Sequence, residues 1–460
     1  MKKLLVILFA LGLVFSFTAP VMATDVSFDG TYRVRGFYDS NSALAKDNEV
    51  GSAYYDQRFR LNTVFQVAEG LKVVVRFDAL DGTWGTSNLR NPSVATALSY
   101  TAPYVGAAVT STTSSQSNLQ FDKAYMSFVT GIGLFEAGYN SWGVWGTGFG
   151  DEESFIGQIG YKVPIGDNLV FGLKTGKVAE GDIGDTYKDR DDDKYTAYAV
   201  YFNDTMQLGV LYAYYRFENY LTKMGAGYSS YGDITAHAVN PYVKLTLGDL
   251  YIESEATWVD GSVNSQLAGT KDIDLEALTF YLKGQYNMGP IYLGALFAYV
   301  QGDDPDTGAT DKIENALGII GSGPDWDPCL ILFTDTCTTA LGSNGSTYNS
   351  TKSTSMTGTQ MDNGYLYQVF AGAAFDKLSI KATLTYAEAH EDFQDGAKNK
   401  FLNKDYGTEF DVTVDYKLYD NLTYTVGAGY LWTGDYYKGT SNTNTIGDTY
   451  LLMNKLQVTF

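Results

Sequence analysis

Residues 55–79, YDQRFRLNTVFQVAEGLKVVVRFDA, decide the fold, because apolar and polar side chains alternate on both sides of one tight turn at Glu69-Gly70. Successive side chains of a β-strand point to opposite faces, so this alternation predicts a hairpin with one apolar face and one charged face. The apolar face carries Tyr55, Phe59, Leu61, Thr63, Phe65, Val67, Leu71, Val73, Val75, Phe77 and Ala79, and the charged face carries Asp56, Arg58, Arg60, Asn62, Lys72, Arg76 and Asp78.

The same alternating unit recurs along the chain without a linker between domains, which is typical of a single closed membrane barrel. We therefore predict an all-β fold, a single transmembrane antiparallel β-barrel over residues 24–460. An even number of strands leaves both chain ends on the periplasmic side. The eighteen predicted strands are residues 28–38, 55–67, 71–79, 119–130, 134–142, 156–164, 168–178, 194–203, 205–217, 234–247, 250–260, 273–286, 291–301, 364–375, 378–390, 406–419, 421–433 and 447–460.

Short turns and long loops alternate between the predicted strands. The turns assigned to the periplasm are rich in Gly, Asp and Asn, which tolerate the positive φ of hairpin turns. The long loops, residues 81–118 and 302–363, fall on the opposite, extracellular side. The short turns are Gly131-Ile132-Gly133, Gly166-Asp167-Asn168, Asn203-Asp204, Gly248-Asp249, Asp376-Lys377 and Asp420-Asn421.

Composition agrees with a membrane barrel and excludes some partners. The chain has 37 Tyr, 25 Phe and 49 Gly but only 9 Pro, 2 Cys and 2 His, an inventory that aromatic girdles and glycine-rich strands would use. A net charge of −21 makes nucleic acid an unfavourable partner. We expect no cofactor, because the sequence has no zinc-ligand spacing, haem motif or phosphate-binding loop.

The amino terminus has the pattern of a cleaved secretory signal peptide, residues 1–23. Lys2 and Lys3 precede an apolar run from Leu4 to Phe17, and Ala23 ends a small-residue cleavage site. The alternative is a membrane anchor, but the run is shorter than the ~20 residues that a spanning helix needs. Export and the barrel pattern together predict the outer membrane of a Gram-negative bacterium.

The carboxyl terminus reads Tyr450-Leu451-Leu452-Met453-Asn454-Lys455-Leu456-Gln457-Val458-Thr459-Phe460. Tyr450, Leu452, Leu456, Val458 and Phe460 share one face, so this is an amphipathic strand with an aromatic last residue. Such an ending resembles the signal that the barrel-assembly machinery recognises. We predict that Phe460 closes the barrel against the first strand, near Phe28.

Both ends of the chain resemble one porin family. Gly407-Thr408-Glu409-Phe410-Asp411, Asp420-Asn421-Leu422 and Gly434-Asp435-Tyr436 look like the closing hairpin of the alginate-export porins, and Arg58-Phe59-Arg60-Leu61-Asn62 is similar to that family's second strand. The resemblance implies an 18-stranded barrel with a charged lumen. It covers the middle of the chain poorly and does not identify alginate as the solute.

Strand phase predicts which charges face the lumen. Inward basic residues outnumber inward acids, although the whole chain is acidic, and a basic lining favours anions. The arginines of the first three strands are the candidate selective surface; alternatively they pair with Asp29, Asp56 and Asp78 and stiffen the wall, and both roles can hold at once. The predicted pore-lining residues are the basic Arg33, Arg35, Arg58, Arg60, Lys72, Arg76, Lys123, Lys162, Lys174, Lys244, Lys283, Lys381, Lys417 and Lys455 and the acidic Asp29, Asp56, Asp78, Glu136, Glu253, Glu255, Glu409, Asp411 and Asp415.

Two loops carry further candidate sites. Cys329 and Cys337 lie close together within 302–363, where an oxidising compartment would allow a local disulfide; two free thiols are the alternative. This loop either folds into the lumen or covers the mouth as an exposed lid. The acidic run that includes Asp189, Asp191 and Asp193 offers a candidate Ca²⁺ site, although a solvated loop or divalent bridging to lipopolysaccharide fits the spacing better.

The leading functional hypothesis is passive diffusion of small hydrophilic, anionic solutes through a water-filled pore. The alternative is a barrel that sheaths an export or electron-transfer partner. An enzymatic barrel would require a nucleophile paired with His237 or His390, and neither histidine has such a partner at recognisable spacing.

Overall fold

The protein is described by a computed structural model that covers residues 25–41, 44, 46, 51–85, 119–150, 153–180, 191–218, 231–265, 269–307, 311–320, 326–334, 361–394 and 399–460. The predicted signal peptide, residues 1–23, lies outside the described residues. Within them, regular structure is almost entirely strand, and the short exceptions are α3 (Leu317–Ile320) and η4 (Asp435–Lys438). No described helix has the length and apolar character needed to cross a bilayer.

Nineteen strands form one sheet, and eighteen of them make up the wall of the barrel. The exception is β14, a two-residue strand that pairs in parallel with β12 while β13 pairs directly with β15. The strands are β1 (Asp25–Asp39), β2 (Ser52–Ala68), β3 (Leu71–Thr83), β4 (Leu119–Thr130), β5 (Gly133–Trp142), β6 (Ser154–Ile165), β7 (Leu169–Ala179), β8 (Asp192–Phe202), β9 (Met206–Phe217), β10 (Tyr231–Leu247), β11 (Leu250–Ser265), β12 (Ile273–Met288), β13 (Ile291–Val300), β14 (Lys312–Ile313), β15 (Gly364–Ala374), β16 (Leu378–Glu388), β17 (Asp405–Tyr419), β18 (Leu422–Thr433) and β19 (Thr449–Thr459). The predicted antiparallel barrel of eighteen strands is confirmed.

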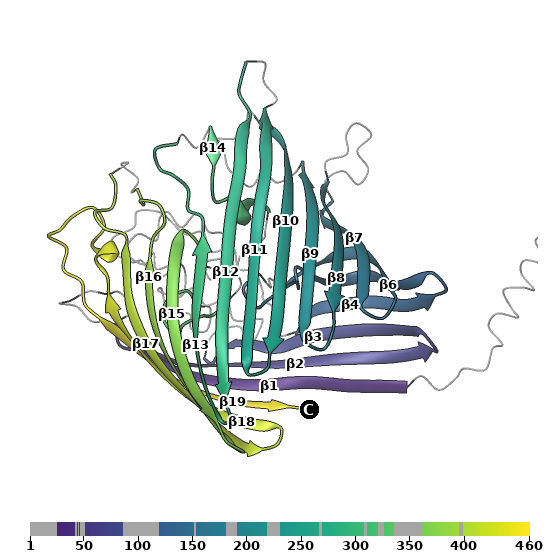
Figure 1. Ribbon diagram of the computed structural model, residues 1–460, viewed down its shortest axis with the longest axis horizontal. Coiled ribbons are helices and arrows are strands. Elements are labelled where there is room, and N and C mark those ends of the chain that lie inside the picture. Colours follow the sequence, from purple (N-terminus) through teal and green to yellow (C-terminus); the bar gives the residue numbers. More distant parts are fainter. Residues whose placement is uncertain are drawn as a thin grey trace, which may run out of the picture.

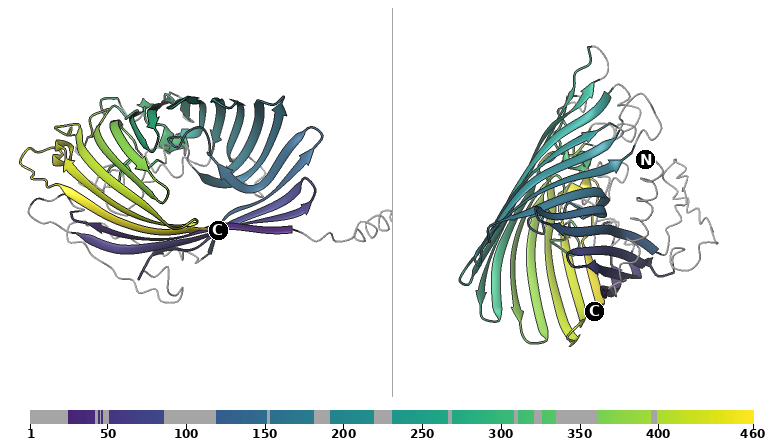
Figure 2. Two further views of the ribbon diagram at one scale, coloured as in Figure 1. Left: turned by 60° about the horizontal axis from the view of Figure 1, so that its bottom comes forward. Right: turned by 90° about the vertical axis from the view of Figure 1, so that its right-hand side faces the viewer.

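The sheet closes where the last strand meets the first, as Figures 1 and 2 show. β19 pairs antiparallel with β1 from Thr31↔Thr459 to Asp39↔Leu451. Phe460 extends this contact, because Gly30 and Phe460 exchange two backbone hydrogen bonds of 2.8 and 3.0 Å. Closure leaves no free sheet edge, which a membrane-spanning sheet requires because lipid offers no hydrogen-bond partners. The predicted pairing of the terminal strand with the strand near Phe28 is confirmed.

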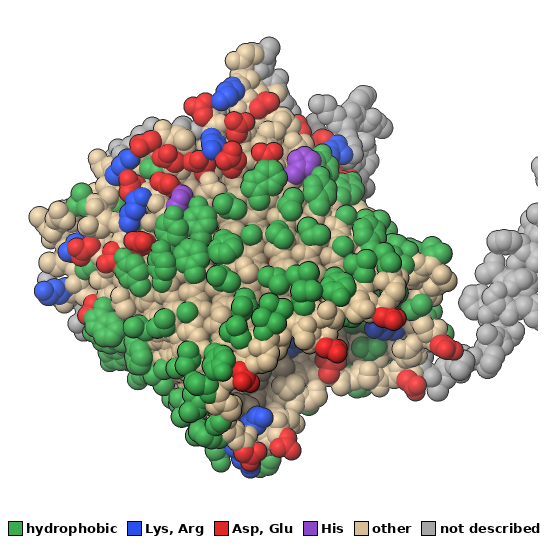
Figure 3. Space-filling view, in the orientation of Figure 1, with side chains coloured by type: hydrophobic (Ala, Val, Ile, Leu, Met, Phe, Trp, Pro, Cys, Tyr) green, Lys and Arg blue, Asp and Glu red, His purple; other side chains and the backbone are tan. Residues whose placement is uncertain are grey.

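The outer face of the barrel is apolar. Phe28, Phe121 and Val369 are 60%, 55% and 56% exposed, and each lies on the face that its strand turns away from the lumen. Figure 3 shows hydrophobic side chains over the middle of this face, with acidic and basic side chains gathered toward its upper and lower edges. This is the arrangement of a lipid-facing apolar belt with a water-exposed edge above and below it.

The buried core lies inside the barrel, where the inner faces of the strands meet segments of the long loops. The central cluster joins Ile234, Val259 and Leu275 of the wall with Ile320, Leu332 and other residues from loop 302–363. Part of that loop is therefore packed within the lumen. The first long loop begins later than predicted, because β3 continues to Thr83, and residues 86–118 lie outside the described part.

Candidate functional site

The arginine wall is built by β1, β2 and β3. Arg35 forms two parallel hydrogen bonds with Asp56 across β1 and β2, Nε–Oδ1 at 3.0 Å and Nη2–Oδ2 at 2.8 Å. Arg60 does the same with Asp78 across β2 and β3, with both bonds at 2.7 Å. These pairs lie directly opposite each other in the strand register, so their alignment follows from the ladder. Bidentate pairing holds both guanidinium planes in fixed orientations on the wall.

Cations also lie opposite one another on this wall. Arg33 lies opposite Arg58 in β2, and Arg35 lies opposite Lys455 in β19. Arg58 Nε is 3.9 Å from Asp78 Oδ2, a long contact with an acid already held by Arg60. Arg33 Nε is buried and has no hydrogen-bond partner among the described residues. The seam between β19, β1 and β2 therefore has an excess of positive charge.

Asp122 is a wall residue that strict alternation does not predict. Alternation turns Lys123 inward and Asp122 outward, but the register shifts between Arg76↔Lys123 and Phe77↔Phe121, so Asp122 has no partner in the β3–β4 ladder. The bulge turns both Asp122 and Lys123 inward. A signal was present in the sequence, because either charge on the lipid face would cost on the order of 2–4 kcal/mol and adjacent charges cannot both face inward on a regular strand.

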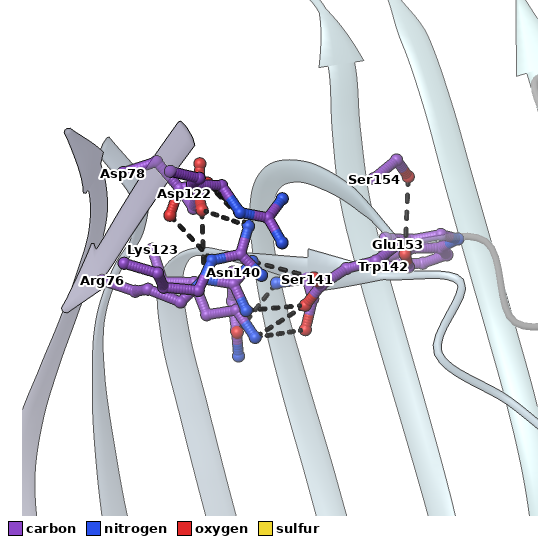
Figure 4. A network of polar contacts seen from close by, with 11 residues as sticks. Arg76, Asp78, Asp122, Lys123, Asn140, Ser141, Trp142, Glu153 and Ser154 are labelled. Carbon is purple, nitrogen blue, oxygen red and sulfur yellow. Dashed lines mark hydrogen bonds and ion pairs between the residues drawn. The ribbon is translucent and has the colours of Figure 1, made fainter. Parts of the chain in front are cut away.

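Asp122 connects the arginine wall to Glu153, which precedes β6 and was also not predicted. Arg76 Nε donates to Asp122 at 3.1 Å, and Glu153 forms ion pairs of 2.8 Å with Arg76 and with Lys123 (Figure 4). Burial opposes ionisation of Glu153, but hydrogen bonds and charge from Arg76 and Lys123 outweigh it and lower the pKa of this carboxyl below its usual value. The network is thus a continuous charged surface from β2 to β6.

Residues 143–150, which follow β5, form a first inward segment that sequence reasoning did not identify. Glu255 on β11 holds it, accepting hydrogen bonds from Thr147 N at 2.6 Å and Thr147 Oγ1 at 2.7 Å. Gly150 permits this close approach, because a Cβ there would lie 2.0 Å from Glu255 Oε1. The alternation of Gly with Trp145 and Phe149 in this segment is the signal that was available.

Residues 326–334 form a second inward segment, so this part of loop 302–363 folds into the lumen and is not an exposed lid. Glu409 on β17 accepts hydrogen bonds from the backbone N–H groups of Leu330, Ile331 and Leu332 at 3.0, 2.7 and 2.7 Å. Asp411 accepts a weaker one from Leu330 N at 3.4 Å. The apolar side chains from Leu330 to Phe333 are buried in the core.

The two inward segments meet inside the barrel. The ring of Phe149 lies 5.3 Å from the ring of Trp326, and both pack against Tyr281 of β12 at 5.1 and 5.5 Å between centroids. Beside the first segment lies a cavity of about 380 Å³. Cations, aromatic rings and amides contribute to its lining, among them Lys123, Lys162, Lys174, Glu136, Asn140, Trp142, Trp145, Tyr198 and Asn240.

The other predicted pore-lining acids lie in different settings. Glu253 accepts hydrogen bonds from the Tyr251 and Tyr281 hydroxyls at 2.7 and 2.8 Å, and Asp29 accepts one from Asn62 at 2.9 Å. Asp415 accepts one from Thr425. Glu255, Glu409 and Asp411 are turned inward as predicted, but all three are buried beneath the inward segments.

The predicted disulfide and calcium site are only partly described. Cys329 is buried and its Sγ lies 3.5 Å from Thr385 Oγ1, whereas Cys337 lies outside the described residues, so the disulfide stays a prediction. Asp189 also lies outside them. Asp191 and Asp193 both form ion pairs with Lys177, so a lysine side chain already neutralises them. The calcium site therefore also stays a prediction.

Comparison with known proteins gives a likeness in fold and none in sequence. No protein-family model matches the chain, and no curated protein is similar enough to count as a relative. Pseudomonas aeruginosa OpdQ matches with a TM-score of 0.50 at 11% identity, over 95% of this chain and 98% of OpdQ. Acinetobacter baumannii OccAB2 matches with a TM-score of 0.50 at 9% identity, over 94% of this chain and 98% of OccAB2.

These matches share the barrel fold of this chain. A BenF-like porin from Pseudomonas fluorescens Pf-5 also matches, with a TM-score of 0.47 at 11% identity over 94% of this chain and 99% of that protein. At such identities the likeness concerns the fold alone. The alginate-export resemblance of the chain ends stays a proposal, and the function of this barrel has to be argued from its own lumen.

Proposed function

We propose that the protein is a passive channel of the Gram-negative outer membrane that carries small hydrophilic solutes and prefers anions. An 18-stranded barrel with an apolar belt and a charged interior supports a water-filled path across the membrane. The likeness to OpdQ and OccAB2 supports the barrel fold on which this proposal rests.

The observation that carries the anion preference is the imbalance of free charge on the wall. Arg33, Lys174 and Lys455 form no ion pair within the described part of the chain. The acids Asp56, Asp78, Asp122, Glu136 and Glu153 are each paired with a cation. Glu255 and Glu409 are occupied by the inward segments. Asp29 and Asp415 also form no ion pair among the described residues, and neither do the cations Lys244 and Lys381. A solute in the lumen therefore still meets more uncompensated positive than negative charge, which favours anions.

The resemblance of the chain ends to the alginate-export porins does not identify alginate as the solute. The two inward segments favour small solutes, because both occupy space that a polymer or a protein would need. The same packing disfavours the alternative of a sheath for an export or electron-transfer partner.

Membrane partners follow from the proposed location. The apolar belt would contact lipid, and the acidic side chains near the upper edge in Figure 3 suit divalent bridging to lipopolysaccharide. Phe460 at the end of β19 would be recognised by the barrel-assembly machinery. We propose no enzymatic role: Nδ1 of His237 lies 2.7 Å from the Tyr212 hydroxyl, and Nε2 of His390 lies 3.3 Å from that of Tyr299.

Reversal potentials of charge variants test the anion preference. In planar bilayers with a salt gradient, the triple variant R33Q/K174Q/K455Q should shift the reversal potential toward cation preference relative to the wild type. The matched control K271Q changes a lysine whose side chain is 67% exposed and which lies outside the strands, and it should cause no shift. Equal reversal potentials for the triple variant and the wild type would contradict the proposal.

A further inference from the structure

Two buried carboxylates on different strands each hold one inward segment of the channel. Glu255 of β11 holds residues 143–150, and Glu409 of β17 holds residues 326–334. Both side chains are almost completely enclosed, with residue exposures of 1% and 0%. A carboxylate in such a place is stable only if its oxygens are fully hydrogen-bonded, so each depends on the segment that it holds.

The carboxylate of Glu409 is a shared hydrogen-bond acceptor for backbone N–H groups. Three consecutive donors, from Leu330 to Leu332, converge on its two oxygens. Convergent N–H groups of this kind form an anion-binding concavity. Phe333, the next residue, has a positive φ of 51°, a conformation that non-glycine residues adopt only when their surroundings enforce it. The ring of Phe333 packs edge-to-face against the ring of Tyr406, with 5.5 Å between the centroids, and this contact holds Phe333 in place.

Glu255 shows the same design with different donors. It accepts the backbone and hydroxyl hydrogen bonds of Thr147, and Asn240 Nδ2 donates to its second oxygen at 2.9 Å. Asn240 in turn accepts a hydrogen bond of 3.0 Å from Trp145 Nε1, so the segment is fixed at two points. Side chains of the barrel wall therefore hold both inward segments in place.

The segments support each other through Phe149 and Trp326, whose rings are 5.3 Å apart. Release of either segment removes the partner against which the other packs. The two anchors are consequently linked, although they lie on β11 and β17.

We propose that Glu409 and Glu255 are positioning residues that jointly set the width of the channel by holding segments 326–334 and 143–150 in the lumen. This inference rests on the proposed channel function. It assigns these two acids a role other than contact with the solute. It also explains why buried acids occur in a lumen whose accessible charge is positive.

Single-channel conductance of the full-length protein tests the proposal. In E409A the N–H groups of Ile331 and Leu332 lose their acceptor, and that of Leu330 keeps only its 3.4 Å contact with Asp411. Segment 326–334 should then leave the wall, and conductance should rise by about twofold or more. E409Q should give an intermediate conductance, because its amide keeps one acceptor oxygen but turns an NH₂ donor toward a backbone N–H. F410A is the matched control: Phe410 lies next to Glu409 on β17 but is 42% exposed on the outer face, so its conductance should match the wild type.

A redox rescue separates positioning from a general effect on the fold. Cys329 Sγ lies 3.5 Å from Thr385 Oγ1, so T385C places a second thiol beside the segment. In the E409A/T385C/C337S variant, oxidation should tie the segment back to β16 and restore the wild-type conductance, and reduction should raise it again. Heat-modifiable migration in gels shows that each variant forms a barrel.

The linkage between the anchors gives a second readout. E255A should also raise conductance, and E255A/E409A should rise by less than the product of the two single effects, since each single change already weakens the shared contact. Wild-type conductance in folded E409A would overturn the proposal. So would an E409A channel that oxidation of the introduced pair does not narrow. A wild-type barrel without conductance would instead contradict the proposed function itself.

Discussion

Asp122 and Glu153 show how single residues set the charge that a solute meets. Alternation predicted Arg60, Arg76 and Lys123 on the inner face, and the structure places them there. It did not predict the two acids that neutralise them, because one acid enters through a bulge and the other from a loop. Periodicity gives the direction of a side chain on a regular strand, but not the irregularities that bring additional groups to the same surface.

Neutralising Glu153 should increase the preference for anions. E153Q removes the ion-pair partner of Arg76 and Lys123, so the reversal potential at neutral pH should shift further toward anions than in the wild type. The pKa of Glu153 is lowered by its hydrogen bonds with Arg76 and Lys123, so the carboxylate keeps its ion pairs until the pH falls below the usual value of a glutamate. The wild type should therefore gain anion preference only at a pH below that usual value, with a smaller gain in E153Q. Equal selectivity at neutral pH would contradict the account.

Glycine at position 150 should be required for the first inward segment. A Cβ at Gly150 would lie 2.0 Å from Glu255 Oε1, whereas one at Gly148 meets nothing within 4 Å. We expect G150A to destabilise the packed segment by about 1–3 kcal/mol and G148A to have little effect. Thermal unfolding of the two variants in detergent, followed by tryptophan fluorescence, distinguishes them. Equal transitions would mean that the contact with Glu255 carries no strain.

The strands were the most predictable elements, because each must satisfy lipid on one face and water on the other. Most predicted bounds agree with the structure to within a few residues, and β4 agrees at both ends. The inward segments were much less predictable. Residues 143–150 and 326–334 have no regular period, and their positions depend on Glu255 and Glu409, which are more than 70 residues away in sequence.

Strand phase predicts opposite outcomes for charges at neighbouring positions. Leu282 of β12 is 41% exposed on the outer face, and Lys283 beside it faces inward and pairs with Glu253 at 3.3 Å. L282R should lower the free energy of unfolding in lipid vesicles by about 2–4 kcal/mol, because it places a charge in the bilayer. K283R keeps an inward charge and should unfold as the wild type does. A neutral effect of L282R would mean that the phase of β12 is wrong.

The whole molecule depends on closure by its last strand. Phe460 exchanges backbone hydrogen bonds with Gly30, and its ring stacks on Phe59 at 6.2 Å. Gly30 allows this contact, since a Cβ there would lie 2.9 Å from Phe460 Cζ. The terminal strand was predicted from its alternation and its aromatic end, and both features now have a physical role at the seam.

Removing that aromatic ring should impair assembly more than a change elsewhere on the outer face. F460A should lower the amount of heat-modifiable barrel in outer-membrane fractions several-fold, because it removes the stacking on Phe59 at the seam. F410A, another outward phenylalanine 42% exposed on β17, is the control and should assemble normally. Equal assembly of both variants would contradict the role assigned to Phe460.

For the whole barrel, we propose that a strongly acidic chain encloses a lumen whose accessible charge is positive. The acidic residues lie in ion pairs, in Glu255 and Glu409 beneath the inward segments, and at the edges of the barrel. The most direct test is the reversal potential of the purified wild-type channel in a planar bilayer across a potassium chloride gradient. The account predicts a potential of the sign set by chloride permeation, and a potential of the sign set by potassium permeation would contradict it.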